Sequence, residues 1–273
     1  MVDTHSHLYD VKFDHDRDAV VARAAECGVN RLLIPNIDVQ TVQQTFDVCN
    51  RYKERCFPML GLHPTSINSD FEKNIEKIST YFENEEIVAV GETGIDLYWD
   101  KQFIAQQLEA FRIHIAWAKK YGLPLCIHCR KSYNEIINIL KKEQDGTLSG
   151  VFHCFPGNLR QAQEVIDLGF TLGIGGVVTY NNAEMATVVQ HIGIEHILTE
   201  TDAPYLPPVP FRGKRNESAY IVNIVQKIAE LKSMSVEDVA KATNANAERV
   251  FSKIREKNEE RRMKNEECIY FIQ

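Results

Sequence analysis

Short apolar runs alternate with longer amphipathic stretches along nearly the whole chain, and no other feature constrains the fold as strongly. The runs are rich in β-branched residues, as buried strands are, and we count eight, at residues 1–7, 31–37, 56–62, 87–92, 123–129, 150–155, 170–178 and 196–202. Between them, apolar positions recur near every 3.6 residues and predict helices, for example at 16–27, 39–53, 101–121 and 159–168. Repeated strand–helix units form parallel sheets, so this pattern predicts an α/β fold of the TIM (β/α)₈ barrel type.

One barrel accounts for almost all of the chain. We expect residues 1–256 to form this single domain, which includes two closing helices near 217–231 and 235–254 after a proline-rich loop. Residues 257–273 form a charged C-terminal tail, and such tails are typically solvated helix or disordered. We find no repeat, linker or second domain in the sequence.

The charge balance limits how this chain can bind nucleic acid. Lys and Arg total 31 against 38 Asp and Glu, a net charge of −7, which argues against a broad basic surface that neutralises phosphates. Any such contact has to be local or mediated by metal ions. No segment approaches the roughly 18 apolar residues that span a bilayer, and the first residues lack the pattern of a secretory leader. We therefore expect a cytoplasmic monomer that does not bind membranes.

The seven cysteines are scattered through the chain, which predicts free thiols rather than a disulfide framework. Cys126 and Cys129 form a C-x-x-C pair, but strand alternation directs their sulfurs to opposite faces of the predicted strand. We therefore expect no thiolate zinc site or redox pair here.

A clear chemical signal lies in the segment Asp-Thr-His-Ser-His at residues 3–7. A spacing of two puts Asp3, His5 and His7 on one side of an extended strand, so that both imidazoles can reach one metal ion. Asp3 would then support the histidine ligands. An exposed pair of histidines on an edge strand is the alternative, but a closed barrel has no edge.

Four more candidate ligands end later predicted strands and interrupt apolar runs: Glu92, His128, His153 and Asp202. The active site of a barrel of this type forms at the strand ends, so residues far apart in sequence converge there. Buried polar side chains are costly unless they are paired or bound to metal. Together with the two earlier histidines they form a set of six, more than one catalytic ion usually takes from a protein. We therefore expect two divalent ions, for which Mg²⁺, Mn²⁺ and Zn²⁺ all fit the nitrogen and oxygen donors.

The predicted assignment divides the six ligands between the ions: His5, His7 and Asp202 for one, His128 and His153 for the other, and Glu92 as a carboxylate bridge. Asp202 would also accept a proton during catalysis. Glu200, two residues earlier on the same face, would orient a water or support a ligand. We expect the histidines at 15, 114, 191 and 196 to lie at the surface or to serve in packing.

Seven motifs occur in one order along the chain: DTHSHL, GLHP, GETGIDLYW, PLCIHCR, HCFPG, TETDAPYLPP and FRGKRNES. Together they resemble the TatD family of metal-dependent deoxyribonucleases, over a stretch from Met1 to about Phe251. The resemblance implies a barrel of the amidohydrolase kind, the same six ligands with Glu92 bridging, and hydrolysis of DNA phosphodiesters, often from the 3′ end of single strands. It also implies that His63 lies near the scissile phosphate; packing on Pro64 is the alternative role.

Several residues near the predicted strand ends are candidates for binding DNA. Arg130, two residues after His128, could pair with a phosphate oxygen, or instead form a salt bridge to a barrel carboxylate. Tyr98 and Trp99 could stack on a base, or instead cap the rim of the barrel. The loop after the eighth predicted strand carries a concentrated basic patch, which could grip the DNA backbone or be an ordinary solvated loop: Arg212, Lys214 and Arg215.

The leading interpretation is a metal-dependent hydrolase that cleaves single-stranded DNA, as a 3′–5′ exonuclease. An amidohydrolase acting on a small ester, amide or aminoacyl-RNA is the alternative, because such a site activates water whatever the substrate. A carbamylated lysine often bridges the metals in those relatives, whereas the predicted bridge here is Glu92, which favours the nuclease. A third interpretation, a catalytically inactive barrel that only binds a partner, fits poorly with a complete ligand set.

Overall fold

The computed structural model describes residues 1–99, 101–181 and 183–255. Its strands form one eight-stranded parallel sheet, hydrogen-bonded in chain order. They are β1 (Val2–Asp3), β2 (Arg31–Pro35), β3 (Cys56–Leu60), β4 (Ala89–Asp96), β5 (Leu125–Arg130), β6 (Gly150–Phe152), β7 (Phe170–Ile174) and β8 (Ile197–Thr199). The ring closes because the Thr4 N–H donates to the Thr199 carbonyl at 3.1 Å and Ser6 bridges Ala203 in parallel. The predicted barrel is confirmed.

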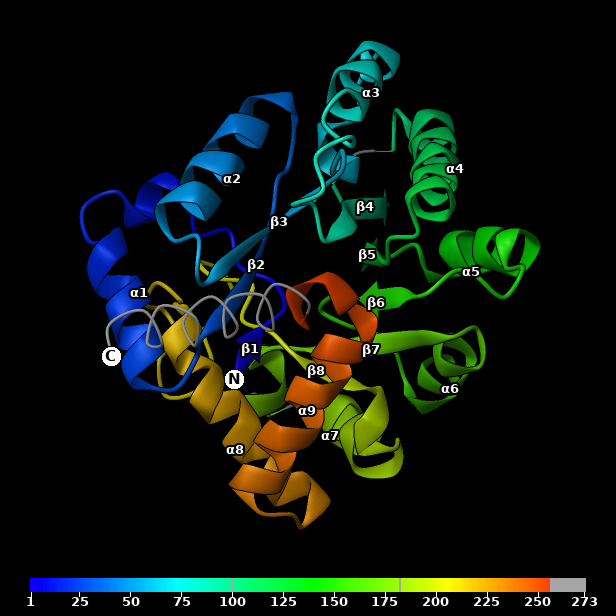
Figure 1. Ribbon diagram of the computed structural model, residues 1–273. Helices are drawn as coiled ribbons and strands as arrows, with labels where there is room; N and C mark the ends of the chain where they lie inside the picture. Colours follow the sequence, from blue (N-terminus) through cyan, green and yellow to red (C-terminus); the bar gives the residue numbers. More distant parts are fainter. Residues whose placement is uncertain (100, 182, 256–273) are drawn as a thin grey trace, which may run out of the picture.

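Helices surround this ring of strands (Figure 1). They are α1 (Arg17–Glu26), α2 (Val39–Arg51), α3 (Phe71–Ser79), α4 (Ile104–Tyr121), α5 (Tyr133–Glu143), α6 (Leu159–Asp167), α7 (Ala183–His191), α8 (Ile221–Lys232) and α9 (Val236–Val250). Side-chain caps start several of them; Asp38 and Asn158, for example, form capping boxes at α2 and α6. The two closing helices predicted after the proline-rich loop are α8 and α9, whereas the predicted tail at 257–273 lies outside the described residues.

Strand alternation divides the apolar residues into two clusters. Leu32 and Ile34 of β2 pack against the surrounding helices, while Leu33 between them faces the inside of the barrel. Cys129 and Cys126 of β5 divide in the same way, so their sulfurs do face opposite sides of the strand. No disulfide joins any of the described cysteines.

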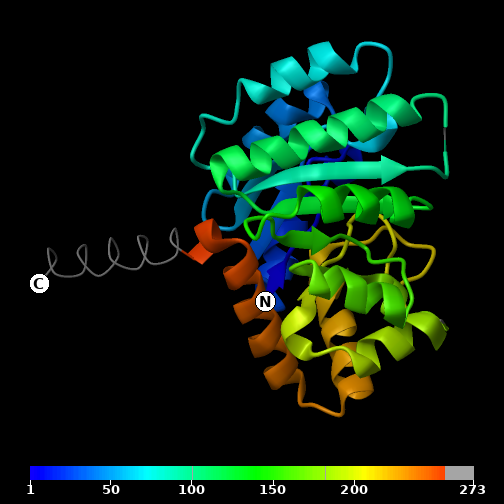
Figure 2. The same cartoon turned by 90° about the vertical axis from the view of Figure 1, so that its right-hand side faces the viewer.

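The inner cluster is closed at one end by α9 and the residues after it. Figure 2 shows α9 lying across the end of the barrel from which the strands start. Ala247, Val250, Phe251 and Ile254 complete the inner cluster there. An apolar plug therefore fills the N-terminal end of the barrel, and the opposite end is left for polar groups.

Some strand ends differ from the predicted ones. The fourth strand runs on to Asp96, four residues beyond the predicted end at Glu92, because it continues to pair with β5 past a register shift between Val90 and Thr93. The first, sixth and eighth strands are shorter than predicted, so His5, His153 and Asp202 lie just after regular strand rather than in it. Within the described ranges, no helix is both long and apolar enough to cross a membrane.

Candidate metal centre

Histidine and carboxylate side chains from six strand ends converge at the C-terminal end of the barrel. His5 and His7 follow β1, His63 follows β3, Glu92 lies in β4, His128 lies in β5, His153 follows β6 and Asp202 follows β8. Their donor atoms form three overlapping groups, each compact enough to hold a metal ion. Parallel strands bring their carboxyl ends to one face, and this explains why residues spread over two hundred positions meet.

Local backbone features help to bring these groups together. Gly94 of β4 has a φ of +136°, and a Cβ at this position would lie only 2.1 Å from the His128 carbonyl oxygen. Only glycine therefore lets β4 approach β5 so closely beside His128. Asp202 has a φ of 56°, a left-handed conformation that aspartate tolerates better than most residues.

The first group joins His5, His7 and Glu92. His5 Nε2 lies 3.3 Å from His7 Nε2 and 3.2 Å from Glu92 Oε2. Asp202 Oδ1 lies near the same nitrogens, at 3.5 Å from His7 Nε2 and 3.9 Å from His5 Nε2. The predicted association of His5, His7 and Asp202 is therefore present in the structure.

The second group joins His63, His128 and the other oxygen of Glu92. Glu92 Oε1 lies 2.9 Å from His128 Nδ1 and 3.3 Å from His63 Nε2, and the two nitrogens are 3.3 Å apart. The two oxygens of Glu92 thus face two different sets of histidines. This arrangement is the one that a bridging carboxylate requires.

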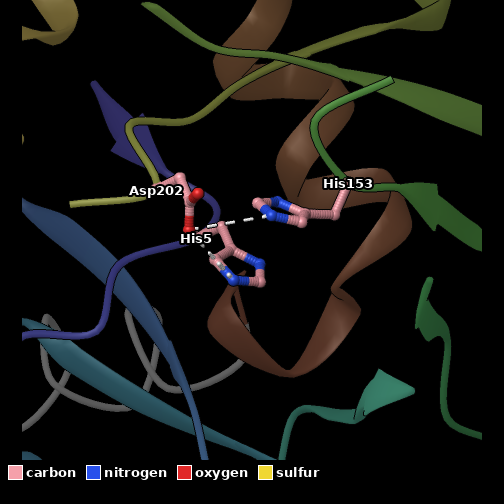
Figure 3. A group of neighbouring side chains, drawn as sticks. All are labelled: His5, His153 and Asp202. Atoms are coloured by element: carbon pink, nitrogen blue, oxygen red, sulfur yellow. Dashed lines mark ion pairs between the residues drawn. The ribbon is translucent and has the colours of Figure 1, made fainter. Parts of the chain in front are cut away.

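The third group contains His5, His153 and Asp202. Figure 3 shows the Asp202 carboxylate directed toward both rings, with Oδ1 3.8 Å from His153 Nε2. The His153 ring stacks on the His5 ring, with centroids 3.5 Å apart. His153 Nε2 is 4.0 Å from Glu92 Oε1, so it also faces the middle of the cluster.

This grouping differs from the predicted division of ligands. His63 takes the place beside His128 that we had assigned to His153, while His153 lies against His5 and Asp202. The reason is geometric, because strand order and ring stacking decide which neighbours meet. The loop after β3 lies beside β4, and β4 lies beside β5, so His63 reaches Glu92 and His128 directly.

Charge distribution in the cluster favours cation binding. Burial raises the pKa of Glu92, but the surrounding His63 and His5 and the hydrogen bond from His128 outweigh it, so the pKa lies well below its usual range. Burial lowers the pKa of His5 and of His63, which favours the neutral form of these two rings, whereas Asp96 and Glu92 outweigh burial and raise the pKa of His128. An ionised carboxylate and neutral imidazoles are the forms that bind metal.

The donor set fits divalent metal ions. The nitrogens of His5 and His7 lie 3.2 and 3.8 Å from Glu92 Oε2, and His5 Nε2 lies 3.9 Å from Asp202 Oδ1, so a cation could bind between these donor atoms. Cys126 lies in the same wall, with Sγ 3.4 Å from His5 Nδ1. Burial raises the pKa of Cys126 well above its usual value, so it remains a thiol and the donors are imidazoles and carboxylates.

Glu200 and Asp3 lie behind the ligands. Glu200 is buried and its Oε1 lies 3.0 Å from His153 Nδ1, which places it as a support for that ring. Burial lowers the pKa of His153, but the Glu200 carboxylate more than compensates and raises it to about 10. Asp3 holds backbone instead of an imidazole: its Oδ1 accepts from the N–H groups of His5 and Thr201.

Sequence reasoning missed Asp96. This residue ends β4, is buried, and lies with its Oδ2 2.9 Å from His128 Nε2. The usable signal was its even spacing from Glu92 in a buried run, which puts both carboxylates on one face of a strand. The strand predicted from the sequence ends at Glu92, which puts Asp96 in the following loop.

The candidate DNA contacts lie at the mouth of this cluster. Tyr98 and Trp99 are 52% and 69% exposed, which is unusual for large aromatic side chains. The guanidinium of Arg130 lies over both rings, 4.0 Å from the centroid of Tyr98 and 5.2 Å from that of Trp99. Among the described residues, Arg130 thus forms a cation–π stack with the two aromatics and no salt bridge.

The three basic residues of the loop after β8 have different environments. The Arg212 guanidinium lies 4.1 Å above the Tyr180 ring, and the Lys214 side chain is exposed. Arg215 instead forms a bidentate ion pair with Asp16, with both distances 2.7 Å, and these hydrogen bonds hold the pKa of Asp16 at about 2. The Arg215 donors therefore anchor the loop to the segment before α1.

The other histidines agree with the expected packing or surface roles. His114 is fully buried in α4, where Nε2 accepts from the Leu62 N–H at 2.9 Å and Nδ1 lies 2.6 Å from the Ala110 carbonyl. His15 and His191 are exposed, and His196 is partly exposed. These four lie apart from the described metal-binding groups.

A barrel whose C-terminal end carries histidines around a shared carboxylate is the framework of a metal-dependent hydrolase. Comparison with known proteins identifies the family within this class: the model of the family described as TatD related DNase matches residues 2–252. The chain therefore belongs to the TatD-related DNase family and is a metal-dependent hydrolase.

Individual relatives agree with this assignment. The chain is 37% identical to an uncharacterized metal-dependent hydrolase, YabD of Bacillus subtilis, over 92% of this chain and 98% of that protein. It is 32% identical to a 3′–5′ ssDNA/RNA exonuclease, TatD of Pectobacterium carotovorum, over 92% and 99% of the two chains. The crystal structure of YjjV, a TatD homologue from Escherichia coli, superposes with a TM-score of 0.87 at 28% identity, covering 92% and 98%.

Proposed function

We propose that this protein hydrolyses phosphodiester bonds at the 3′ ends of single-stranded DNA and that it uses two divalent metal ions. The observation that carries the proposal is the position of Glu92, whose two oxygens face two separate sets of histidine nitrogens. Two-ion sites are typical of enzymes that cleave phosphate esters. The similarity to an exonuclease from Pectobacterium carotovorum supports the choice of substrate.

The described side chains that would hold two ions, with Glu92 contributing to both, are His5, His7, His153 and Asp202 for one, and His63 and His128 for the other. Mg²⁺, Mn²⁺ and Zn²⁺ all suit this set of donors. When bound, a pair of such ions lowers the pKa of a water and neutralises charge on the phosphoryl oxygens.

We assign the role of proton acceptor to Asp202. Its side chain is 16% exposed, whereas those of Glu92 and Glu200 are 3% and 1% exposed. Burial raises the pKa of Asp202, but the hydrogen bond with His7 and the nearby His153 lower it, so it is ionised at neutral pH. Glu200 holds His153 from behind, and His63 borders the mouth with its side chain 12% exposed.

Aromatic rings paired with cations lie on several loops around the mouth. Each pair joins residues at or after the ends of two different strands: Arg130 with Tyr98 and Trp99, Arg212 with Tyr180, and Lys12 with Tyr205. Stacked bases and a phosphate backbone need such a combination of flat apolar faces and positive charge. These local pairs, with Lys214, would let an acidic protein hold a polyanionic strand whose bases are unpaired.

The experiment that tests the proposal uses single-stranded DNA labelled at the 5′ or the 3′ end, with Mg²⁺, Mn²⁺ or EDTA. A 3′–5′ exonuclease shortens the 5′-labelled strand in single-nucleotide steps and releases the 3′ label at once as mononucleotide. RNA and duplex DNA of the same sequence test the choice of strand. No cleavage with any metal, combined with turnover of a small ester or lactone, would contradict the nuclease and support the amidohydrolase alternative.

A further inference from the structure

Asp96 is a buried carboxylate whose two oxygens serve two different parts of the site. Its Oδ2 lies 2.9 Å from His128 Nε2, and its Oδ1 accepts from the backbone N–H groups of Tyr98 at 2.8 Å and Trp99 at 3.2 Å. The Asp96 N–H donates to Gln107 Oε1 at 2.9 Å, so α4 holds the residue in place. Asp96 is only 1% exposed, which leaves it out of reach of a substrate.

The contact with His128 decides which ring nitrogen faces the cluster. An ionised carboxylate can only accept hydrogen bonds, so Asp96 keeps one proton of His128 on Nε2 and leaves Nδ1 as the nitrogen that can give up its proton to bind a metal ion. Nδ1 is the atom that lies 2.9 Å from Glu92 Oε1. Asp96 therefore holds His128 in the tautomer and the orientation that a ligand needs.

The contacts with the backbone decide where the two aromatic rings point. The N–H groups of Tyr98 and Trp99 both donate to Asp96 Oδ1, and these two hydrogen bonds close a tight turn directly after β4. The Tyr98 and Trp99 rings then meet edge to face, with centroids 5.0 Å apart, and Arg130 lies over them. The Leu97 N–H donates to the Arg130 carbonyl at 2.9 Å, which ties the turn to the end of β5.

We propose that Asp96 is a positioning residue that fixes the distance between the aromatic stack of Tyr98, Trp99 and Arg130 and the metal-binding cluster at His128. A single rigid side chain joins the two, so a base held on the stack meets the reacting end of the strand at a constant spacing. The identity of the stacked group as a nucleobase rests on the proposed function. The mechanical link between the aromatic stack and the metal-binding cluster is independent of the proposed function.

The test compares Asp96→Asn with Asp96→Ala in protein freed of metal by EDTA. Titration calorimetry with Mn²⁺ reports on the cluster. Acrylamide quenching of Trp99 fluorescence, in a Trp117→Phe background that leaves one tryptophan, reports on the turn. Both variants are first checked for an unchanged circular dichroism spectrum.

Asn keeps an oxygen for the two N–H groups but presents an NH₂ to His128, which forces the imidazole proton onto Nδ1. We therefore expect Asp96→Asn to weaken Mn²⁺ binding about 10- to 100-fold, the range for lost support of a ligand, while Trp99 quenching stays as in the parent. Asp96→Ala removes both contacts. It should weaken Mn²⁺ binding to the same degree and also change the quenching constant of Trp99.

A matched control is Asp145→Asn in the loop between α5 and β6, at the opposite end of the barrel. Asp145 Oδ1 also accepts from a backbone N–H two residues on, that of Thr147 at 3.0 Å, but it faces no histidine of the cluster. This variant should leave both measurements unchanged. If Asp96→Ala altered only one of the two properties, or neither, the proposed link would be overturned. Neither readout involves DNA, so a failed nuclease assay would not be mistaken for a failed link.

Discussion

The two ends of this barrel are built from the same eight strands, but they contain opposite kinds of side chain. At the N-terminal end, Phe251 and its neighbours in and after α9 close an apolar interior. At the C-terminal end, imidazoles and carboxylates crowd around Glu92. Burial of the apolar end stabilises the folded state, whereas the crowded polar end destabilises it until a cation is bound. The comparison predicts that stability and activity can be changed separately.

The largest effect on activity is expected for Asp202→Asn. The amide cannot accept a proton as the carboxylate does, and a metal ligand is weakened at the same time. We expect kcat on single-stranded DNA to fall by about 10²- to 10⁴-fold or more, the range for loss of a general base. The fold should stay intact, as judged by circular dichroism, because the amide has the same size and shape as the carboxylate. Turnover within tenfold of the parent would contradict the role given to Asp202.

The matching change at the other end is Phe251→Ala. Phe251 is fully buried in the inner cluster, and its truncation leaves a cavity under the strands. The free energy of unfolding should fall by about 3–5 kcal/mol, measured by urea titration. The kcat at 20 °C with saturating Mn²⁺ should stay within twofold of the parent. A parallel loss of activity would show that the two ends are coupled.

A pH titration distinguishes a packing histidine from the ligands. Burial lowers the pKa of His114 from 6.5 to about 4. In the unfolded chain His114 binds a proton near pH 6.5, whereas in the folded protein it binds one only near pH 4. The contribution of His114 to the free energy of unfolding is therefore fully present above pH 6.5. It falls by up to about 3 kcal/mol as the pH decreases to 4.

His114→Gln keeps an acceptor for the Leu62 N–H and removes the titrating group. Urea titrations of the metal-free protein at pH 7, 5.5 and 4.5 should show a smaller loss of stability in this variant than in the parent. An identical slope in both proteins would mean that His114 does not contribute to the acid sensitivity.

A smaller effect is expected for Trp99→Ala at the mouth. Loss of one stacking surface should raise KM for a single-stranded oligonucleotide about 5- to 150-fold, since stacking contributes roughly 1–3 kcal/mol per base. The Mn²⁺ affinity should be unchanged, because the side chain is 69% exposed and lies outside the cluster. Steady-state kinetics on oligonucleotides of increasing length would measure the change, and an unaltered KM would exclude Trp99 as a contact.

The smallest effect is expected for Arg215→Ala. Its guanidinium pairs with Asp16 at a partly exposed position, and such pairs contribute about 0–1 kcal/mol to stability. The KM for DNA should stay within twofold of the parent, whereas the parallel variant Arg212→Ala should raise it. Equal increases in both variants would show that Arg215 contacts the strand after all.

Individual residues show how far the sequence was informative. The spacing of His5 and His7 and the strand-end positions of Glu92 and Asp202 were enough to place them in one cluster, because periodicity identifies the face and chain order identifies the end of the barrel. Asp96 was missed because β4 continues four residues beyond its predicted end. His63 was expected near the phosphate, yet the structure brings its Nε2 within 3.3 Å of Glu92 Oε1, which no sequence spacing indicates.

The amino-acid sequence by itself determined the eight-fold repeat of strand and helix and the kinds of donor at the strand ends, since both follow from short-range periodicity. Only the tertiary structure decided which donors share Glu92, that His153 stacks on His5, and that Arg215 pairs with Asp16 instead of facing the mouth. These contacts depend on the closure of the ring and on side-chain rotamers packed across it. Both are set by neighbours that lie far apart along the chain.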